Sequence, residues 1–475
     1  MKYKLIAGNL AALFATNWPA NRIVQCKEQK KVLQMIDNVR KLNKIGNYNG
    51  ALEALEGIEN KDRYHYCEAA KSYLALKDYN AALTSIDKVI SLKQDWVGAY
   101  GIKISVLYNQ KQFDSIVPTL IDMINHSEKL TDRENSYHLV FNTILDYNIP
   151  GVLTLIDSLL EYYKYRLGED DFYNFYKGIV NANTKKMELA SDNFNKITNV
   201  EKFGVRSTGA ASFSYGASLI EVLEGDYSES LPVIYFSKNN VSISNFETVL
   251  LASCDDGYFN IFIDLIIASF SKKLTRKLLH IHLINPVSST LDRCSELSGK
   301  YDFFNFSYEA NPGAQKLEFA CSRFVRLEEF LSFYKKDIVV CDMDSCFVSD
   351  FDARALLGED DVAIKSDHSC ALHYYPWRQL IASFVIFKYS DPTIKLANNL
   401  KKFLMHFIQK NDQNYWFVDQ TALFCLLDYH YSNHELRYNS IERTSNMVLV
   451  PDARSESKED FVKRMIKSLH PDASH

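Results

Sequence analysis

Two carboxylates, Asp342 and Asp344, stand in the stretch KKDIVVCDMDSCFVSDF, which covers residues 335–351. The apolar run directly before them is typical of a buried β-strand. Two like charges held this close repel each other, so the pKa of one carboxyl group should rise. A divalent cation removes the conflict, because Mg²⁺ or Mn²⁺ binds one or two carboxylates together with water and substrate phosphates. The pair therefore predicts a metal site suited to a diphosphate ligand.

A solvated turn is the alternative interpretation of the two aspartates, and for an isolated Asp-x-Asp it would be preferred. The context favours the metal site, because a buried strand precedes the pair and a second apolar step, CFVSDF, follows it. Zinc fits poorly. Cys341 and Cys346 flank the pair, but zinc sites need further Cys or His residues at short spacing.

From Phe246 onward the chain alternates between short apolar runs and amphipathic stretches, beginning with TVLLASC, GYFNIFIDLIIASFSKK and KLLHIHLIN. This alternation predicts a mostly parallel sheet covered by helices on both faces. In such sheets ligands bind beyond the carboxyl ends of the strands, where the strand order reverses. The aspartate pair follows the end of one of these strands.

The stretch SRFVRLEEFLSFYKKDIVVCDMDSCFVSDF resembles the part of GT-A fold glycosyltransferases that leads into their metal-binding Asp-x-Asp motif. Glycogenin-like and lipopolysaccharide galactosyltransferase-like enzymes are the most similar in pattern. The resemblance extends from VLLASCDDGYF through YYPWRQLIASFVIFK to NYWFVDQTALFCLL, and it covers roughly residues 246–430. It implies an α/β, Rossmann-like GT-A domain that transfers a hexose from a nucleotide-sugar, with a UDP-sugar as the expected donor.

The resemblance also implies a role for each matching residue. Asp342 and Asp344 would hold Mn²⁺ or Mg²⁺ against the nucleotide diphosphate, with Asp342 also near the ribose, and Arg323 would meet the donor phosphate or sugar. Asp419 and Gln420 would lie under the donor sugar and orient it for transfer. The remaining matches are the base-binding loop and the place where the backbone approaches the donor sugar: Ser253, Cys254, Asp255 and Tyr258 for the loop, Ala382 and Ser383 for the sugar.

The chain departs from the family pattern at two places. It has IASF where the family has an Asn-Ala-Gly-like run, and no histidine has the context of the family's third metal ligand. Among His430, His434 and His470, we select His470 as the third ligand because it comes late in the chain, as the family ligand does. Each of the three has a plain surface histidine as its alternative.

The first half of the chain repeats a polar turn, an aromatic residue, and a small or aliphatic residue three places later. The repeated positions, including weaker copies at Ile149 and Met187, are 48, 79, 113, 149, 187 and 227. This spacing is close to the ~34-residue period of tetratricopeptide repeats, which the region resembles over roughly residues 30–238. Ala81 and Ala82 would let neighbouring helices approach closely. A concave surface for a protein partner and a spacer or dimerising element remain open as functions.

Composition excludes some classes of partner and compartment. The 475 residues carry a net charge of only −5 and no dense Lys/Arg block, which argues against nucleic acid or an anionic membrane as a partner. Nine scattered cysteines indicate free thiols and a reducing cytoplasm. Residues 1–20 imitate a secretory signal, but Asn9 and Asn17 interrupt the apolar stretch and favour an amphipathic helix. No apolar run is long enough for a transmembrane segment.

We therefore expect a tetratricopeptide-like domain at 1–240, a GT-A domain at 245–455 and a C-terminal tail at 456–475. The expected activity is metal-dependent glycosyl transfer to a hydroxyl group of a glycan, a lipid-linked glycan or a protein. The helical repeats would recognise the acceptor or a protein partner. The Asp419–Gln420 match leans toward retention of configuration, with inversion left open. The alternative is a non-enzymatic scaffold with a degenerate transferase domain.

Overall fold

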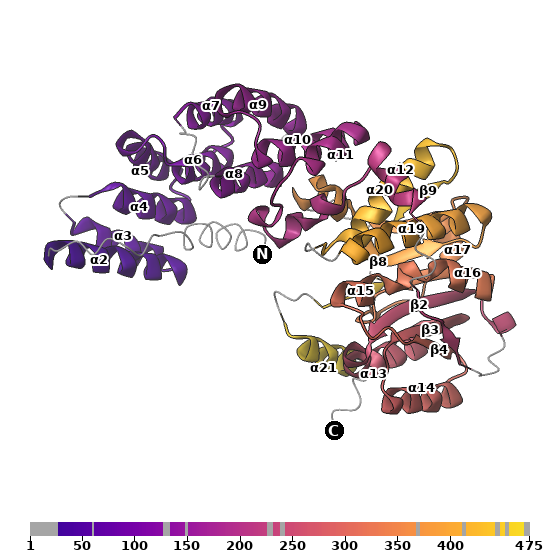
Figure 1. Ribbon diagram of the computed structural model, residues 1–475. Coiled ribbons are helices and arrows are strands. Elements are labelled where there is room, and N and C mark those ends of the chain that lie inside the picture. Colours follow the sequence, from indigo (N-terminus) through magenta and orange to yellow (C-terminus); the bar gives the residue numbers. More distant parts are fainter. Residues whose placement is uncertain are drawn as a thin grey trace. The chain divides into compact units, whose positions relative to one another are not determined.

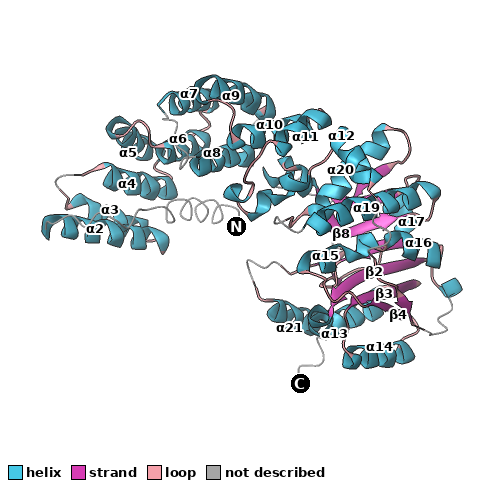
Figure 2. Cartoon of the chain, in the orientation of Figure 1, coloured by secondary structure: helices cyan, strands magenta, loops and turns pink. Residues whose placement is uncertain are grey.

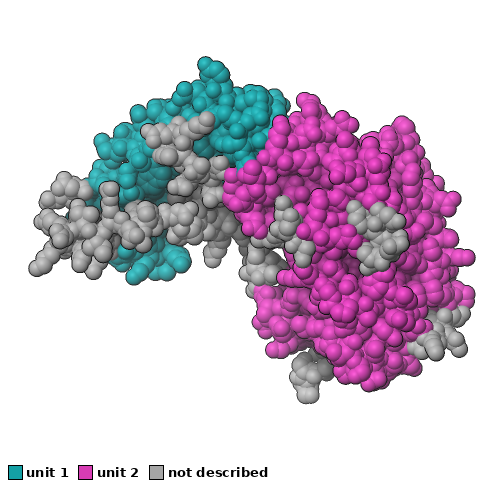
Figure 3. Space-filling model, in the orientation of Figure 1, with its two compact units in different colours: residues 1–180 teal, residues 181–475 magenta. Residues whose placement is uncertain are grey.

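The chain forms two compact units, Met1–Val180 and Asn181–His475, which Figure 3 shows in different colours. The boundary lies between Val180 and Asn181, some way before the expected boundary at 240–245, so residues 181–240 belong to the second unit. In the computed structural model the described residues are 27–58, 61–126, 134–147, 151–225, 231–237, 243–366, 371–410, 415–441, 447–451 and 456–469.

The first unit is built from helices that pack in chain order (Figure 1). They are α2 (Lys27–Lys44), α3 (Tyr48–Glu56), α4 (Arg63–Leu76), α5 (Tyr79–Leu92), α6 (Val97–Asn109), α7 (Ile116–His126), α8 (Glu134–Tyr147), α9 (Val152–Leu167) and α10 (Asp171–Asn183), the last of which crosses the unit boundary. Each helix from α2 to α6 packs on the next, and α2, α4, α6 and α8 also pack on one another in sequence. Stacked helix pairs predict this pattern. Their assignment as tetratricopeptide repeats stays a prediction.

The repeated polar–aromatic motif marks the start of a helix. Asn47 caps α3, which begins at Tyr48, and Asp78 caps α5, which begins at Tyr79. A short polar side chain at this position accepts a hydrogen bond from an otherwise unpaired backbone N–H. Ala82 is fully buried in α5, as close helix packing requires. The copies at 149 and 227 lie outside the described residues.

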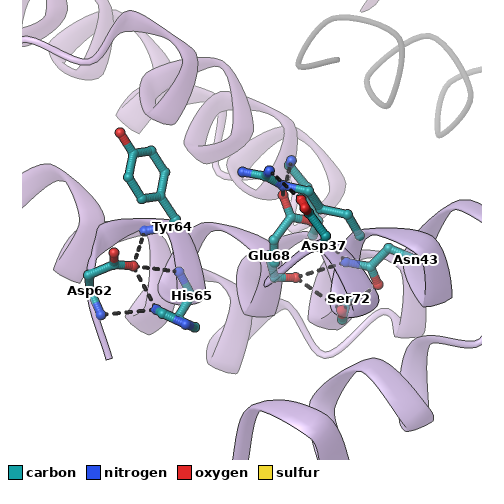
Figure 4. Close-up of polar contacts among 9 residues, drawn as sticks. Asp37, Asn43, Asp62, Tyr64, His65, Glu68 and Ser72 are labelled. Carbon is teal, nitrogen blue, oxygen red and sulfur yellow. Dashed lines mark hydrogen bonds and ion pairs between the residues drawn. The ribbon is translucent and has the colours of Figure 1, made fainter. Parts of the chain in front are cut away.

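A polar cluster joins α2 to α4 (Figure 4). The buried Glu68 carboxylate accepts hydrogen bonds from Asn43 Nδ2 at 3.1 Å and from Lys71 Nζ at 2.7 Å. Ser72 Oγ donates to Asn43 Oδ1 at 2.7 Å. Arg40 Nε lies 3.7 Å from the same carboxylate. Because each buried polar group has a partner, the cluster fixes the register of the two helices without leaving a bare charge.

The second unit contains an eight-stranded mixed sheet in the order β1-β4-β3-β2-β5-β8-β7-β9. Strands β2 to β5 are mutually parallel where they pair, and β8 is antiparallel to both β5 and β7. The strands are β1 (Tyr235–Phe236), β2 (Thr248–Asp255), β3 (Lys277–Ile284), β4 (Phe304–Glu309), β5 (Asp337–Cys341), β7 (Val362–Ser366), β8 (Leu380–Phe387) and β9 (Tyr438–Ile441), and β6 (Cys346–Phe347) pairs separately with β10 (Val448–Leu449). This is the α/β class that the sequence predicts.

Helices cover both faces of the sheet (Figure 2). On one face the apolar side chains of β2, β3 and β5 pack with α13 (Asp256–Lys273), α14 (Ser288–Lys300) and α21 (Lys458–Leu469). The opposite side carries α15 (Lys316–Val325), α16 (Leu327–Tyr334), α19 (Asp391–Lys410) and α20 (Val418–Ser432). Shorter helices are α11 (Met187–Asn195), α12 (Ala217–Glu224), α17 (Ala353–Leu357) and α18 (Pro376–Gln379), with 3₁₀ turns at Phe113–Ser115, Glu201–Phe203, Val205–Ser212, Ile243–Asn245 and Ala371–Tyr374.

The segment expected as a C-terminal tail contributes to the core of the second unit. Within it, α21 buries Phe461, Met465 and Leu469 in the same apolar cluster as α13. The apolar positions recur at i, i+4 and i+8, which is the spacing of one helix face. The seven described cysteines are free and buried. Among the helices within the described ranges, none is long and apolar enough to cross a membrane.

Candidate functional site

The carboxyl ends of β2 and β5 meet where the strand order reverses. From β2 the chain moves outward through β3 and β4, then returns to β5 on the other side of β2. β2 and β5 are parallel neighbours, with Leu251 paired to Val340. An open α/β sheet leaves a crevice at such a switch point. The residues that follow β2 and β5 therefore share one edge of the sheet.

Asp342 and Asp344 face the same side because they alternate with buried residues. Cys341, Met343 and Ser345 are buried, whereas the two aspartates keep part of their surface exposed. Met343 and Asp344 lie in a turn that follows the last residue of β5, closed by a hydrogen bond from the Ser345 N–H to the Asp342 carbonyl at 3.2 Å. The spacing of the Asp-x-Asp motif therefore places both carboxylates at the crevice.

The electrostatics of the pair are unfavourable. Burial, and then the charge of Asp342, raise the pKa of Asp344 to about 7, although Arg323 and Lys458 act in the opposite direction. This is the rise that two close carboxylates predict. A ligand with positive charge at this point would relieve the repulsion.

Arg323 joins three elements at the crevice. It is buried on α15, with Nη2 2.7 Å from Asp342 Oδ1 and 3.4 Å from Asp419 Oδ2, and its Nη1 donates to the Ala320 carbonyl at 2.8 Å. Burial raises the pKa of Asp419, and the positive charge of Arg323 partly offsets this effect. The structure thus brings Arg323, Asp342 and Asp419 together.

Gln420 is positioned differently from the expectation. With its amide nitrogen facing two carbonyls, the side chain donates to the Trp377 oxygen at 3.0 Å and to the Leu380 oxygen at 2.8 Å. Leu380 is the first residue of β8. The carboxamide therefore fastens the start of α20 to β8, which makes Gln420 a positioning residue. Just before Asp419, Phe417 has φ 142°, a conformation that a bulky side chain rarely adopts.

β8 runs beside the aspartate pair. Cys341 pairs with Phe384, so Ser383 is the next residue toward the end of the sheet where Asp342 lies. The register of β7 against β8 shifts between Ile364 and Lys365, which leaves Ala382 and Ser383 inside an irregular stretch. Such irregularities often occur beside binding sites. Ser383 is partly exposed, whereas Ala382 is buried.

The residues expected on a base-binding loop lie at the end of β2 and in the first turn of α13, and Tyr258 contacts the aspartate pair. Burial raises the pKa of Tyr258, followed by the charges of Asp344 and Asp342, and a hydrogen bond with Asp344 acts in the same direction. Asp255 caps α13 by accepting from the Tyr258 backbone N–H at 2.7 Å. Ser253 Oγ donates to the Phe319 carbonyl at 3.4 Å. Cys254 differs from the expectation, because its thiol lies in the apolar core and cannot face a nucleotide.

Lys458 belongs to the site although the sequence analysis does not include it. Its Nζ lies 3.8 Å from the centre of the Tyr258 ring, and its charge lowers the pKa of Asp344. Lys458 is the first residue of α21. A lysine at a helix N-terminus opposes the helix dipole, and this local conflict is the only sequence signal that could have marked it.

The predicted third metal ligand receives no support from the described residues. His470 lies outside them, and the preceding residue, Leu469, accepts a hydrogen bond from Lys272 at the end of α13 away from Tyr258. His430 is buried, and its Nδ1 lies 2.7 Å from Glu435 Oε2. Within the described ranges, no group of three or more His, Cys, Asp or Glu side chains could hold a metal ion.

The donor set nevertheless fits Mg²⁺ or Mn²⁺. These ions need only one or two carboxylates when substrate phosphates and water complete the shell. Asp342 and Asp344 supply that number of hard oxygen ligands on one side of the crevice. Zinc remains a poor fit, because Cys341 and Cys346 are buried, and burial raises the pKa of both thiols, to about 12 and about 11.

Two tryptophans and an acidic stretch lie elsewhere in the second unit. Trp377 is fully buried and packs against Gly209, whereas Trp416 is 39% exposed. In the acidic stretch 359–361, Asp361 accepts from the Arg437 backbone N–H at 3.1 Å, which links β7 to β9. The acidic stretch is therefore part of the connection between α17 and β7.

No sequence-family model matches the chain, and no curated protein matches it. Three solved structures that it resembles are named as glycosyltransferases. GlyE from Streptococcus pneumoniae TIGR4 shares 13% identity over 42% of this chain and 46% of GlyE, with a TM-score of 0.29. Mouse xyloside xylosyltransferase 1 shares 9% sequence identity over 41% of this chain and 84% of its own, with a TM-score of 0.28. The bifunctional glycosyltransferase WbbM shares 14% sequence identity over 73% of this chain and 68% of its own, with a TM-score of 0.31. The chain thus spans about half the length of GlyE.

Proposed function

We propose that the chain is a metal-dependent glycosyltransferase with a GT-A domain, which transfers a sugar from a nucleotide-sugar to an acceptor hydroxyl. The observation that carries the proposal is the placement of Asp342 and Asp344 on one side of the crevice at the switch point. Arg323 and Lys458 approach the same pair from two other elements. Carboxylates for a metal together with fixed positive charges form the chemistry that a nucleoside diphosphate requires.

Each residue of the site has a distinct task in this proposal. Asp342 and Asp344 would hold Mn²⁺ or Mg²⁺, which as a Lewis acid neutralises negative charge on the departing diphosphate. Lys458 would supply a point charge to a phosphate. Asp419 would accept hydrogen bonds from donor-sugar hydroxyls, while Arg323 holds it in place. Gln420 holds α20 against β8 and so fixes the position of Asp419.

A non-enzymatic scaffold is the competing function. The burial of Arg323 between Asp342 and Asp419 argues against a scaffold. Burying a charge costs several kcal/mol in desolvation, and only close pairing with opposite charges offsets that cost. A degenerate site gains nothing from keeping three such groups together.

We also propose that the helical first unit recognises the acceptor. A fragment that begins at Asn181 should then retain donor hydrolysis and lose transfer, and equal transfer by both proteins would refute this role.

The proposed activity is tested with a panel of nucleotide-sugars, beginning with UDP-sugars, by measuring release of the nucleoside diphosphate with Mn²⁺, Mg²⁺ or EDTA. Wild type should release it only with metal. Asp342→Asn should lower the rate at least about a hundredfold. Asp264→Asn is the matched control, because Asp264 is an exposed aspartate on α13 whose ion pair contributes little. Metal-independent release, or equal rates in both variants, would refute the proposal.

A binding measurement separates the enzyme from the scaffold even when the donor sugar in the panel is wrong. UDP with Mn²⁺ at 100 times its Kd should stabilise the folded chain by about 2.7 kcal/mol. A scaffold with a degenerate site predicts no stabilisation by any nucleotide, with or without metal.

A further inference from the structure

A cavity of about 220 Å³, separate from the crevice at Asp342 and Asp344, lies at the carboxyl ends of β3 and β4. Ile284 and Glu309, the last residues of these strands, line it together with side chains from α15 and α19. α15 presents Ser322 to this cavity and Arg323 to the aspartate pair, and Arg326, which also lines the cavity, directly follows α15. The cavity is therefore distinct from the site proposed for the nucleotide.

The positive charge in the cavity wall already has carboxylate partners. Arg326 is buried, and its Nε donates to Glu309 Oε2 at 2.8 Å, while Nη2 donates to the Pro232 carbonyl at 2.6 Å. Its Nη1 lies 3.4 Å from Glu329 Oε1. His282 Nε2 lies 3.5 Å from Glu309 Oε2. The charge of Arg326 is therefore already paired with two carboxylates.

The same wall also carries a second carboxylate and an unpartnered hydroxyl group. Glu318 is the second carboxylate lining the cavity, and burial raises its pKa. It accepts hydrogen bonds from two neutral donors, Asn311 Nδ2 at 2.8 Å and the Gln315 backbone N–H. Ser322 is 6% exposed, and its Oγ has no hydrogen-bond partner among the described residues. A buried polar group without a partner is costly, so the cavity is built to receive hydrogen-bond donors.

Charge and shape define the ligand class. Among the described residues that line the cavity, Arg326 is the only cation, against the carboxylates of Glu309 and Glu318. Apolar side chains, including those of Met405 and Ile408 on α19, form part of the wall. An ammonium or guanidinium group donates several hydrogen bonds without accepting any, and a short methylene chain packs against apolar walls.

We propose that this cavity binds a small organic cation, a primary ammonium or guanidinium on a short aliphatic chain, through Glu318 and Ser322. The charged head donates to the Glu318 carboxylate and to Ser322 Oγ, while the methylene groups lie against Met405 and Ile408. This inference is independent of the proposed glycosyl transfer. A cavity filled only by water is the alternative, because water also satisfies polar walls of this size.

The test measures binding to the full-length chain by calorimetry, with EDTA present and n-butylammonium and agmatine as probes. 1-Butanol serves as the uncharged analogue. Wild type should bind both cations saturably and should not bind the alcohol. Glu318→Gln keeps the size of the side chain and should weaken cation binding about tenfold or more. Ser322→Ala removes only the hydroxyl and should also weaken binding.

Two control variants make the result specific. Glu296→Gln removes an exposed carboxylate on α14, and Asp344→Asn removes a charge from the nucleotide site; neither should alter cation binding. The proposal is overturned if neither cation binds saturably, if butanol binds as well as butylammonium, or if Glu318→Gln and Ser322→Ala both bind like wild type. Loss of binding in Asp344→Asn alone would place the cations at the aspartate pair and would equally overturn it.

Discussion

The unfavourable charge of Asp344 allows a quantitative prediction for Asp344→Asn. Burial and the charge of Asp342 raise the pKa of Asp344 from 3.8 to about 7. One unit of pKa shift corresponds to about 1.4 kcal/mol, so ionisation of Asp344 destabilises the folded chain by at most about 4 kcal/mol. Asp344 keeps part of its surface in solvent, and screening should reduce the measured effect to about 1–3 kcal/mol.

The sign of the pH dependence follows from the direction of the shift. Because the pKa is higher in the folded chain than in the unfolded chain, the folded chain holds this proton more tightly. The contribution of Asp344 to stability should therefore be greatest below pH 3.8, decline as the pH rises to about 7, and stay constant above that. Asp344→Asn lacks the decline. It should be more stable than wild type above pH 7 by about 1–3 kcal/mol and close to wild type near pH 4.

Urea denaturation on both sides of this pH window measures the difference directly, with Asp264→Asn as the matched control. Mn²⁺ should stabilise wild type above pH 7 and should stabilise Asp344→Asn much less, because an amide oxygen is a weaker ligand for a hard cation. A turn-forming aspartate predicts the opposite sign. If Asp344→Asn is less stable than wild type above pH 7, and Mn²⁺ protects both proteins equally, the electrostatic reasoning is refuted.

Three further variants test the surroundings of the site. Gly209→Ala places a Cβ 2.2 Å from Trp377 Cγ and should destabilise the chain by about 1–3 kcal/mol or more, whereas Gly299→Ala, which meets nothing within 4 Å, should be neutral or stabilising by up to about 1 kcal/mol; equal urea midpoints would contradict this. Lys458→Met should weaken UDP–Mn²⁺ binding about tenfold with unchanged stability, and an unchanged Kd would remove Lys458 from the site. Arg323→Lys should lower kcat/KM for the donor at least tenfold, because a lysine cannot reproduce the planar fork between two carboxylates; wild-type kinetics would refute that role.

Local patterns predicted the parts of the site that follow strands. The apolar run before Asp342 forms β5, and in the turn that follows it Asp342 and Asp344 are partly exposed while Met343 is buried. Along β2 the two-residue period of a strand places Cys254 in the core with Leu250 and Ala252, whereas the sequence analysis assigned Cys254 by resemblance alone. Alternation along β2 could therefore have corrected the assignment of Cys254.

Long-range packing determines what the sequence could not predict. Lys458 reaches Tyr258 only because α21 packs on α13, about 200 positions earlier in the chain. The role of Gln420 depends on two carbonyls at residues 377 and 380, and a backbone acceptor has no sequence signature. The boundary at Val180 was equally hidden, because helices before and after it have the same amphipathic pattern.

The balance of charge at the crevice explains why the metal and the nucleotide should bind together. Asp342, Asp344 and Asp419 carry three negative charges when ionised, and Arg323 and Lys458 carry two positive charges, which leaves one negative charge in a partly buried site. A diphosphate alone would add more negative charge and be repelled. A divalent cation reverses the sign, so the crevice then attracts a diphosphate, and the diphosphate in turn supplies the oxygen ligands that two carboxylates leave open. By linkage, each ligand must strengthen the binding of the other. Removing one carboxylate should therefore stabilise the ligand-free chain and weaken the binding of metal and nucleotide. In Asp344→Asn, stability should rise while nucleotide affinity falls.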